Sequence, residues 1–273
     1  MRPSPARAAA VAVAVMAVAC SVAGACGAPT DDVSEAAGAG PPQPGDRFQW
    51  QLGDDPPDLG VDADTYDLDL FETSAAEVAA LHERGVTVAC YLSAGTAEAF
   101  RPDVGAFPPA TVGNPLEDYP DERWLDVRRI DELAPVLEDR LDRCADKGFD
   151  AVEPDNVDAY ASDSGFAITA ADQVVFNRWL ADAARRRGLS PGLKNAPDLV
   201  TELVGDFDWA LVEQCLEFEE CEAYQPFVDA GAAVFVVEYR GRPDDVCRAA
   251  RDLTGMTVVL ADRDLDGPVD PCP

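Results

Sequence analysis

The feature that most constrains the fold of this chain is a regular alternation of short apolar runs with longer helical stretches. Short apolar runs predict buried strands, and helices between them predict crossover connections to parallel neighbours. Glycines between a helical stretch and the next apolar run, such as Gly85 and Gly148, are typical helix stop signals. We expect strands at 48–52, 66–71, 86–92, 150–153, 192–194, 207–212, 234–238 and 257–260, and helices at 74–84, 131–147, 170–187, 197–204, 223–230 and 244–253.

Eight such strands within residues 46–273 favour one α/β domain, a (β/α)8 TIM barrel, a fold that typically takes about 250 residues. A doubly wound open sheet is the alternative. We expect no helix after the first strand, where the loop DDPPDLGVDAD stands in its place. A long excursion between Ser93 and Asp131 follows the third strand. In a barrel it belongs at the carboxyl end of the strands, where long loops build binding sites.

The first 26 residues have the pattern of an export signal. Two arginines precede an apolar run at 8–19 that is too short to span a membrane. Small residues before Cys20 and Cys26 resemble a bacterial lipoprotein signal, and we favour lipidation of Cys26 because a tether-like segment follows it; Cys20 and a simply cleaved signal remain alternatives. Residues 27–45, rich in Ala, Gly and Pro, predict a disordered linker. The domain is therefore expected to be secreted or anchored to the outer face of the cell membrane.

Six further cysteines in an exported chain predict disulfide bonds. Cys215 and Cys221 are close in sequence and are expected to pair. Cys247 with Cys272 would then hold the C-terminal tail. Cys90 and Cys144 either pair or remain as buried thiols.

A net charge of -31 makes nucleic acid and anionic lipid unsuitable partners and favours a cationic ligand. The single histidine, His82, falls within a predicted helix, which excludes a Ser-His-Asp triad, a Cys-His pair and a multi-histidine zinc site. Three aspartates at 262, 264 and 266 imitate the start of a calcium loop, but its twelfth position is Pro273 rather than Glu. We therefore expect no metal and, without a Gly-rich phosphate loop, no cofactor.

Acids, amides and tyrosines collect where the predicted strands end, which is where barrel enzymes place their active sites. Glycoside hydrolysis requires two such carboxyl groups, one that donates a proton and one that stays ionised, and crowding separates their pKa values. Tyr119 and Trp124 in the excursion are candidates to stack on sugar rings. The strand-end residues are Gln51, Asp67, Asp69, Tyr91, Glu153, Asp155, Asn156, Asp158, Lys194, Asn195, Glu213, Gln214, Glu238 and Tyr239.

At these residues the chain resembles glycoside hydrolase family 114, which contains endo-α-1,4-polygalactosaminidases on a β/α barrel. The resemblance is carried by the runs FQWQL, YDLDLF, CYLSAGTAE, FRPD, WLDVR, GFDAVEPDNVDAY, GLKN, EQCLEFEEC and VFVVEY, in order from Phe48 to Tyr239. It implies that Asp155 in EPDN is the nucleophile and Glu213 in EQC the general acid/base. It also implies that Asp67, Asp69, Tyr91, Asn156, Asp158, Lys194 and Glu238 surround the sugar.

The resemblance implies an endo-acting hydrolase of α-1,4-linked galactosamine polymer that works by a retaining mechanism. A monomer is expected by default for a tethered hydrolase. Retention requires the Asp155 and Glu213 carboxyls to lie roughly 5–5.5 Å apart, whereas about 8 Å or more would favour inversion. Galactosamine without acetyl groups is cationic, so Asp67 or Asp69 is expected to pair with substrate ammonium groups. The alternatives are a non-catalytic carbohydrate-binding barrel at the cell surface, a deacetylase, which would need histidines to hold a metal, and an envelope-assembly lipoprotein without turnover.

Overall fold

The computed structural model describes residues 40–53 and 56–273. The predicted signal at 1–26, with Cys20 and Cys26, and most of the predicted linker lie outside the described residues. Residues 41–46 form a turn on the domain: Pro42 is buried, and the Gln43 backbone N–H donates to the Asp46 carboxylate at 2.8 Å. Within the described ranges, no helix combines the length and apolarity needed to cross a membrane.

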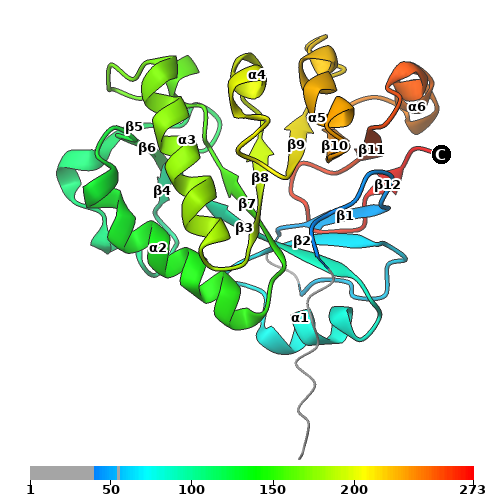
Figure 1. The fold of residues 1–273 in the computed structure, drawn as a ribbon, viewed down its shortest axis with the longest axis horizontal. Helices are drawn as coiled ribbons and strands as arrows, with labels where there is room; N and C mark the ends of the chain where they lie inside the picture. The colour runs from blue at the N-terminus through cyan, green and yellow to red at the C-terminus, as the bar shows by residue number, and fades with distance from the viewer. Residues whose placement is uncertain (1–39, 54–55) are drawn as a thin grey trace, which may run out of the picture. The chain divides into compact units, whose positions relative to one another are not determined.

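The core of the domain is a nine-stranded sheet that curves into a nearly closed barrel (Figure 1). The first eight strands pair in parallel in chain order, and the last runs antiparallel to its neighbour. This order lacks the reversal of a doubly wound sheet, so the (β/α)8 prediction is confirmed. The strands are β1 (Phe48–Gln51), β2 (Thr65–Asp69), β3 (Thr87–Ser93), β7 (Ala151–Asp155), β8 (Ser190–Lys194), β9 (Trp209–Glu213), β10 (Ala233–Glu238), β11 (Thr257–Leu260) and β12 (Asp270–Pro271).

From β2 to β11, helices connect each barrel strand to the next and cover the outside of the sheet (Figure 1). Two of them begin at capping boxes, formed by Ser74 with Glu77 and by Thr169 with Asp172. Gly148 ends the second helix with φ 90°, as its sequence position predicts. The helices are α1 (Ala75–His82), α2 (Ile130–Lys147), α3 (Ala170–Arg185), α4 (Val200–Leu203), α5 (Gln225–Asp229) and α6 (Pro243–Ala249), with 3-10 turns η3 (Ala159–Ala161), η4 (Pro197–Leu199), η5 (Cys221–Tyr224) and η6 (Ala250–Asp252). Between β1 and β2 the described residues contain no helix, as expected.

Side chains of each strand alternate between the barrel interior and the helix layer. Inside, Phe48 stacks on Phe235 with ring centroids 4.1 Å apart, and Trp209 meets the same ring at its edge. Gly192 of β8 faces Trp209 so closely that a Cβ atom would lie 2.4 Å from the indole. A glycine is therefore required there for the bulky indole to fill the barrel.

The seam between β1 and β11 is closed by the segment that follows β11. The backbone N–H groups of Leu52 and Gly53 both donate to the carbonyl of Leu265 at 3.1 Å. The Gln49 side-chain amide donates to the Gly267 carbonyl and accepts from the Val269 N–H at 3.1 Å. Side-chain hydrogen bonds thus replace part of a strand ladder here, so buried polar groups remain satisfied.

The excursion after β3 folds into a small antiparallel sheet of its own, in the order β4-β6-β5. Its strands are β4 (Thr96–Glu98), β5 (Val112–Pro115) and β6 (Glu122–Leu125), with 3-10 turns η1 (Val104–Ala106) and η2 (Pro109–Thr111). It stands at the carboxyl end of β3, on the face where the sequence predicted the excursion.

Residues 40–53 and 56–273 contain three disulfide bonds. The predicted pairs Cys215–Cys221 and Cys247–Cys272 are confirmed. The third bond joins Cys90 of β3 to Cys144 of α2, which settles the alternative left open by the sequence.

Candidate active site

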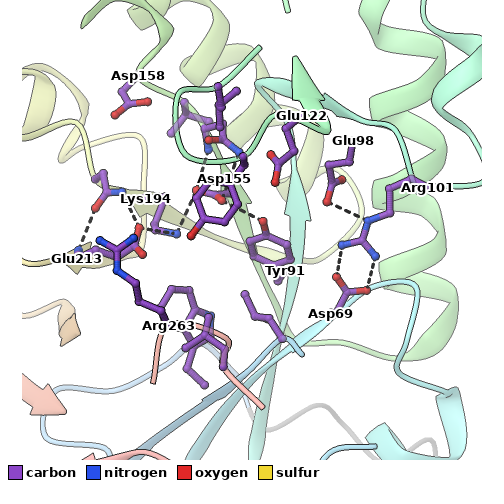
Figure 2. A pocket seen from close by; sticks show the side chains of 18 of the residues that line it. Asp69, Tyr91, Glu98, Arg101, Glu122, Asp155, Asp158, Lys194, Glu213 and Arg263 are labelled. Carbon is purple, nitrogen blue, oxygen red and sulfur yellow. Dashed lines mark hydrogen bonds and ion pairs between the residues drawn. The ribbon is translucent and has the colours of Figure 1, made fainter. Parts of the chain in front are cut away.

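A cavity of about 430 Å³ lies at the carboxyl ends of the barrel strands, beneath the small sheet (Figure 2). Strand ends supply one wall and the excursion supplies the other. Its lining includes Trp50, Asp69, Tyr91, Glu98, Arg101, Tyr119, Glu122, Trp124, Asp155, Asn156, Asp158, Lys194, Asn195, Glu213, Tyr239 and Arg263.

Asp155, the last residue of β7, is held by donors on both carboxylate oxygens. Tyr91 donates to Oδ2 at 3.0 Å, and Lys194 Nζ donates to Oδ1 at 3.0 Å. The backbone N–H of Asn156 also donates to Oδ1 at 2.8 Å. Asn156 adopts φ 60°, a left-handed conformation that asparagine tolerates better than most residues. These bonds fix the carboxylate in one orientation.

Glu213, the last residue of β9, faces Asp155 across Lys194 (Figure 2). Asn195 donates from its side-chain amide to Oε2 at 2.9 Å and accepts the Glu213 backbone N–H through its carbonyl at 2.9 Å. The Tyr239 hydroxyl donates to Oε1. Burial raises the pKa of Glu213, but the charge of Lys194 and the bonds from Tyr239 and Asn195 outweigh it, so the pKa lies below its ordinary value.

Lys194 of β8 is the electrostatic centre of the site. Its ammonium contacts Glu153 at 2.9 Å, Asp155 at 3.0 Å and Glu213 at 3.2 Å, and it lies over the Trp50 ring. Burial alone would lower the pKa of Lys194, but these carboxylates raise it well above its ordinary value. Lys194 therefore remains a cation that stabilises its neighbours as anions.

The floor of the site is a pair of buried carboxyl groups, Asp67 of β2 and Glu153 of β7. Both are fully buried, and the Trp50 indole N–H donates to Glu153 Oε2 at 3.1 Å. Burial and the charge of Glu153 raise the pKa of Asp67 well above its ordinary value. Burial beside a second carboxyl group favours the protonated form of Asp67, because two neighbouring buried carboxylates cannot both ionise readily.

An ion-pair network supports the opposite wall. Arg101 donates to Asp69 at 3.0 Å and to Glu98 at 2.9 Å, and all three side chains are buried. Arg140 of α2 bonds Asp103 at 2.8 Å and lies 3.5 Å from Glu98. Asp69 is therefore neutralised by Arg101, which joins β2 to the excursion.

Two further carboxyls that line the cavity have strongly raised pKa values. Burial, together with the charges of Glu98 and Asp155, raises the pKa of Glu122 to about 7. Burial and the charge of Asp155 raise the pKa of Asp158 to about 6. Glu122 accepts one hydrogen bond from Thr96 at 2.9 Å, and no Lys, Arg or His of the described chain lies within salt-bridge distance of it. Glu122 thus opens to the cavity without a cationic partner in the described chain, and its carboxylate form is populated only as the pH rises through about 7.

Most of the residues that the sequence suggested meet in this cavity. Those that line it are Asp69, Tyr91, Asp155, Asn156, Asp158, Lys194, Asn195, Glu213 and Tyr239, together with the two excursion aromatics Tyr119 and Trp124.

Five of the suggested residues do not line this cavity. Glu153 lies in the floor beneath it, Gln214 lines a neighbouring cavity, and Gln51, Asp67 and Glu238 lie elsewhere. Gln51 bonds the Asp266 carbonyl and the Asp58 N–H at the barrel seam, and Asp67 is sealed beneath the cavity. Side chains alternate along β10, and Val237 and Tyr239 point into the barrel. Glu238 between them therefore points away from the barrel axis. Its carboxylate accepts the Leu216 backbone N–H at 2.8 Å. None of the three contacts the cavity.

The sequence reading missed several lining residues. Trp50 alternates inward with Phe48 on β1, a signal that periodicity carries. Glu98, Arg101 and Glu122 come from the excursion, whose fold no periodicity revealed. His82 lies away from the cavity, where its ring bonds Asp150 at 2.9 Å beside the start of β7. Among residues 40–53 and 56–273, no group of three or more His, Cys, Asp and Glu side chains has an arrangement suited to a metal ion.

Comparison with known proteins places this geometry among glycoside hydrolases. A family model described as glycoside-hydrolase family GH114 matches residues 29–273. An uncharacterized protein of Deinococcus radiodurans is 29% identical over 234 residues, which cover 76% of this chain and 73% of that protein.

Two solved structures share the fold. The crystal structure of Aspergillus fumigatus Ega3 in complex with galactosamine is 35% identical with a TM-score of 0.81, over 86% of this chain and 98% of that one. The glycoside hydrolase domain of PelA from Pseudomonas aeruginosa is 16% identical with a TM-score of 0.64, over 81% and 96% of the two chains. At that identity, PelA supports the barrel fold alone.

Proposed function

The chain belongs to glycoside hydrolase family GH114, and from that premise we propose that it cleaves α-1,4-linked galactosamine polymer internally, using Asp155 and Glu213. The observation that carries the proposal is the placement of these two carboxyls on either side of Lys194 in one cavity. The galactosamine bound by Ega3 supports the sugar.

In the proposed reaction Asp155 attacks the anomeric carbon of the sugar as the bond to the leaving oxygen breaks. Glu213, which must first take up a proton because its neighbours lower its pKa, passes that proton to the leaving oxygen, and the leaving chain departs as an alcohol. Glu213, now ionised, then takes a proton from water, whose oxygen attacks the anomeric carbon and releases Asp155. Hydrogen bonds from Lys194, Tyr91 and Asn156 hold the Asp155 carboxylate in one orientation for the first step.

The positions of the two carboxyls support retention. One oxygen of Asp155 and one of Glu213 lie 3.0 and 3.2 Å from the same Lys194 nitrogen, so they are within about 6 Å of each other. Retaining enzymes hold their carboxyls roughly 5–5.5 Å apart, whereas inverting enzymes leave roughly 6.5–9.5 Å for a water molecule.

Glu122 is the proposed counter-ion for a substrate ammonium group. Asp67 and Asp69, which the sequence suggested for this task, are occupied: the first is buried and protonated, and the second is bound by Arg101. Glu122 lines the cavity and lacks a cationic partner in the described chain. A primary ammonium would supply that missing partner, whereas an N-acetyl group carries no charge. We therefore propose that the de-N-acetylated polymer is preferred.

The proposal extends to where the enzyme works. The predicted signal, three disulfides and a net charge of -31 support an exported enzyme that meets its polymer outside the cytoplasm, anchored through Cys26 or free. We propose that it acts as a monomer.

Incubation of the purified domain with de-N-acetylated galactosamine polymer tests the proposal, with oligosaccharide products read by mass spectrometry. Asp155→Asn and Glu213→Gln variants run alongside. Oligosaccharides from the wild type alone are the expected result. Retention of intact polymer by the wild type, without cleavage, would instead favour the carbohydrate-binding barrel.

A further inference from the structure

A second cavity, of about 350 Å³, adjoins the first on the side of Glu213. Glu213, Asn195 and Tyr239 line both cavities, whereas Asp155 lines only the first. Glu213 therefore lies between the two cavities, and Asp155, the proposed nucleophile, lies on the side of the first cavity.

The outer edge of this second cavity is a short loop that presents an exposed aromatic ring. The disulfide Cys215–Cys221 closes the loop, and the Phe218 N–H donates to the Gln214 carbonyl at 3.0 Å. The buried Glu238 carboxylate accepts the Leu216 N–H, which fixes the loop to the end of β10. Phe218 is 60% exposed although the loop around it is constrained. A fixed ring at a cavity rim is suited to stacking on a sugar face.

Charges in this second cavity also fit a cationic chain. Asp118, Asp158 and Glu220 line it, and Arg263, which lies 5.6 Å from the Tyr239 ring, is the basic residue among its lining. With Glu213, which also lines this cavity, four carboxyl groups face one guanidinium, so the surface is net negative and attracts ammonium groups.

We propose that the second cavity binds the leaving-group side of the polymer and that Phe218 is its stacking platform. The inference rests on the proposed function. A general acid must contact the oxygen that leaves, and the nucleophile must contact the anomeric carbon. The bound polysaccharide therefore passes Glu213 as it runs from the first cavity to the second. The sugar that becomes bound to Asp155 occupies the first cavity, and the released chain occupies the second.

The test compares two substrates that differ only on the leaving-group side. One is the de-N-acetylated polymer, and the other is a short galactosamine oligosaccharide with fluoride as its leaving group, which places no sugar in the second cavity. Phe218→Ala is expected to lose about three- to tenfold in kcat/KM on the polymer, the size of one lost aromatic contact, and to keep its activity on the fluoride. Its cleavage products from the polymer should also change in length.

Two matched variants interpret the result. Val175→Ala removes an equally exposed apolar side chain (59%) on α3, outside both cavities. It should leave kcat/KM unchanged on both substrates. Phe100→Ala removes a 63% exposed ring that lines the first cavity only, and should lower activity on both substrates alike. Equal kinetics of Phe218→Ala and wild type on the polymer, or equal losses on both substrates, would overturn the inference. A wild type that cleaves neither substrate would instead overturn the proposed function.

Discussion

At the scale of single residues, Lys194 explains why several carboxylates can share one cavity. Its ammonium contacts Glu153, Asp155 and Glu213, and Asp67 keeps a proton beneath them. Removing the ammonium would leave buried anions uncompensated, a change that costs about 3–5 kcal/mol for an ordinary buried pair. The cation is therefore part of both the stability of the barrel and the chemistry of the site.

The pH profile should report on the hydrogen bond between Tyr239 and Glu213. Glu213 must be protonated to act as the acid, so activity falls as pH rises through its pKa, which the bond lowers. Tyr239→Phe removes the bond, raises this pKa and moves the falling limb of kcat/KM to higher pH. Tyr160→Phe, a half-buried tyrosine outside the cavity, is the control and should leave the limb in place. A limb that stays fixed or moves to lower pH in Tyr239→Phe would argue against Glu213 as the acid.

Discrimination between amino and acetamido sugars should depend on Glu122. Glu122→Gln keeps the shape and the bond to Thr96 while removing the charge. We expect KM for the de-N-acetylated polymer to rise about tenfold, the loss of one charge-assisted hydrogen bond, with little change for a fully N-acetylated polymer. Because the pKa of Glu122 is about 7, the wild-type preference should also weaken as pH falls through 7 and the carboxylate is protonated. Equal effects of the substitution on both polymers would remove Glu122 from this role.

At the scale of elements, the turn after β3 joins the excursion to Asp155, the proposed nucleophile. The N–H groups of Ala94 and Gly95 donate to the Asp155 carbonyl at 3.0 and 3.1 Å. A Cβ atom on Gly95 would lie 1.6 Å from the Asn156 carbonyl oxygen, a backbone atom that cannot move aside without moving Asp155.

Gly95→Ala should therefore displace Asp155 and lower kcat by about 100-fold or more, because misplacement by about 1 Å is sufficient for such a loss. Gly105→Ala, in the same excursion, is the control, since a Cβ atom there meets nothing within 4 Å. The measurement is kcat on the polymer, with circular dichroism to verify folding. Full activity in folded Gly95→Ala would show that this turn does not position the nucleophile.

Elements also separate what the sequence predicts from what it does not. The alternation of apolar runs and helical stretches predicted all eight barrel strands, and the strand ends gave a set of residues that includes Asp155 and Glu213. Only the family resemblance singled these two out as the catalytic pair. Because side chains alternate along a strand, Glu238 and Tyr239 in VFVVEY must point to opposite faces of the sheet. The choice of site residues from strand ends did not use this alternation. Arg101 follows β4, a strand of three residues, and Glu122 begins β6, a strand of four residues. Both lie in a segment rich in Pro and Gly. Such short strands show no periodicity, and only tertiary packing places them over the site.

At the scale of the whole molecule, the net charge of -31 should govern encounter with a cationic polymer. Attraction between exposed charges is screened over about 10 Å at 0.1 M salt. We expect kcat/KM on de-N-acetylated polymer to fall steadily as sodium chloride rises, while hydrolysis of the N-acetylated polymer, if any, changes little. An initial-rate series across ionic strength provides the measurement. A flat profile for the cationic polymer would show that the acidic surface serves another purpose.

The central claim is that Asp155 forms a covalent bond to the sugar. A slow galactosaminyl fluoride that accumulates as a glycosyl-enzyme, followed by proteolysis and peptide mass spectrometry, tests it most directly. The account predicts one added sugar on the peptide that contains Asp155, and none in Asp155→Asn. Label on another residue, or no label together with a first product of inverted anomeric configuration, would contradict it.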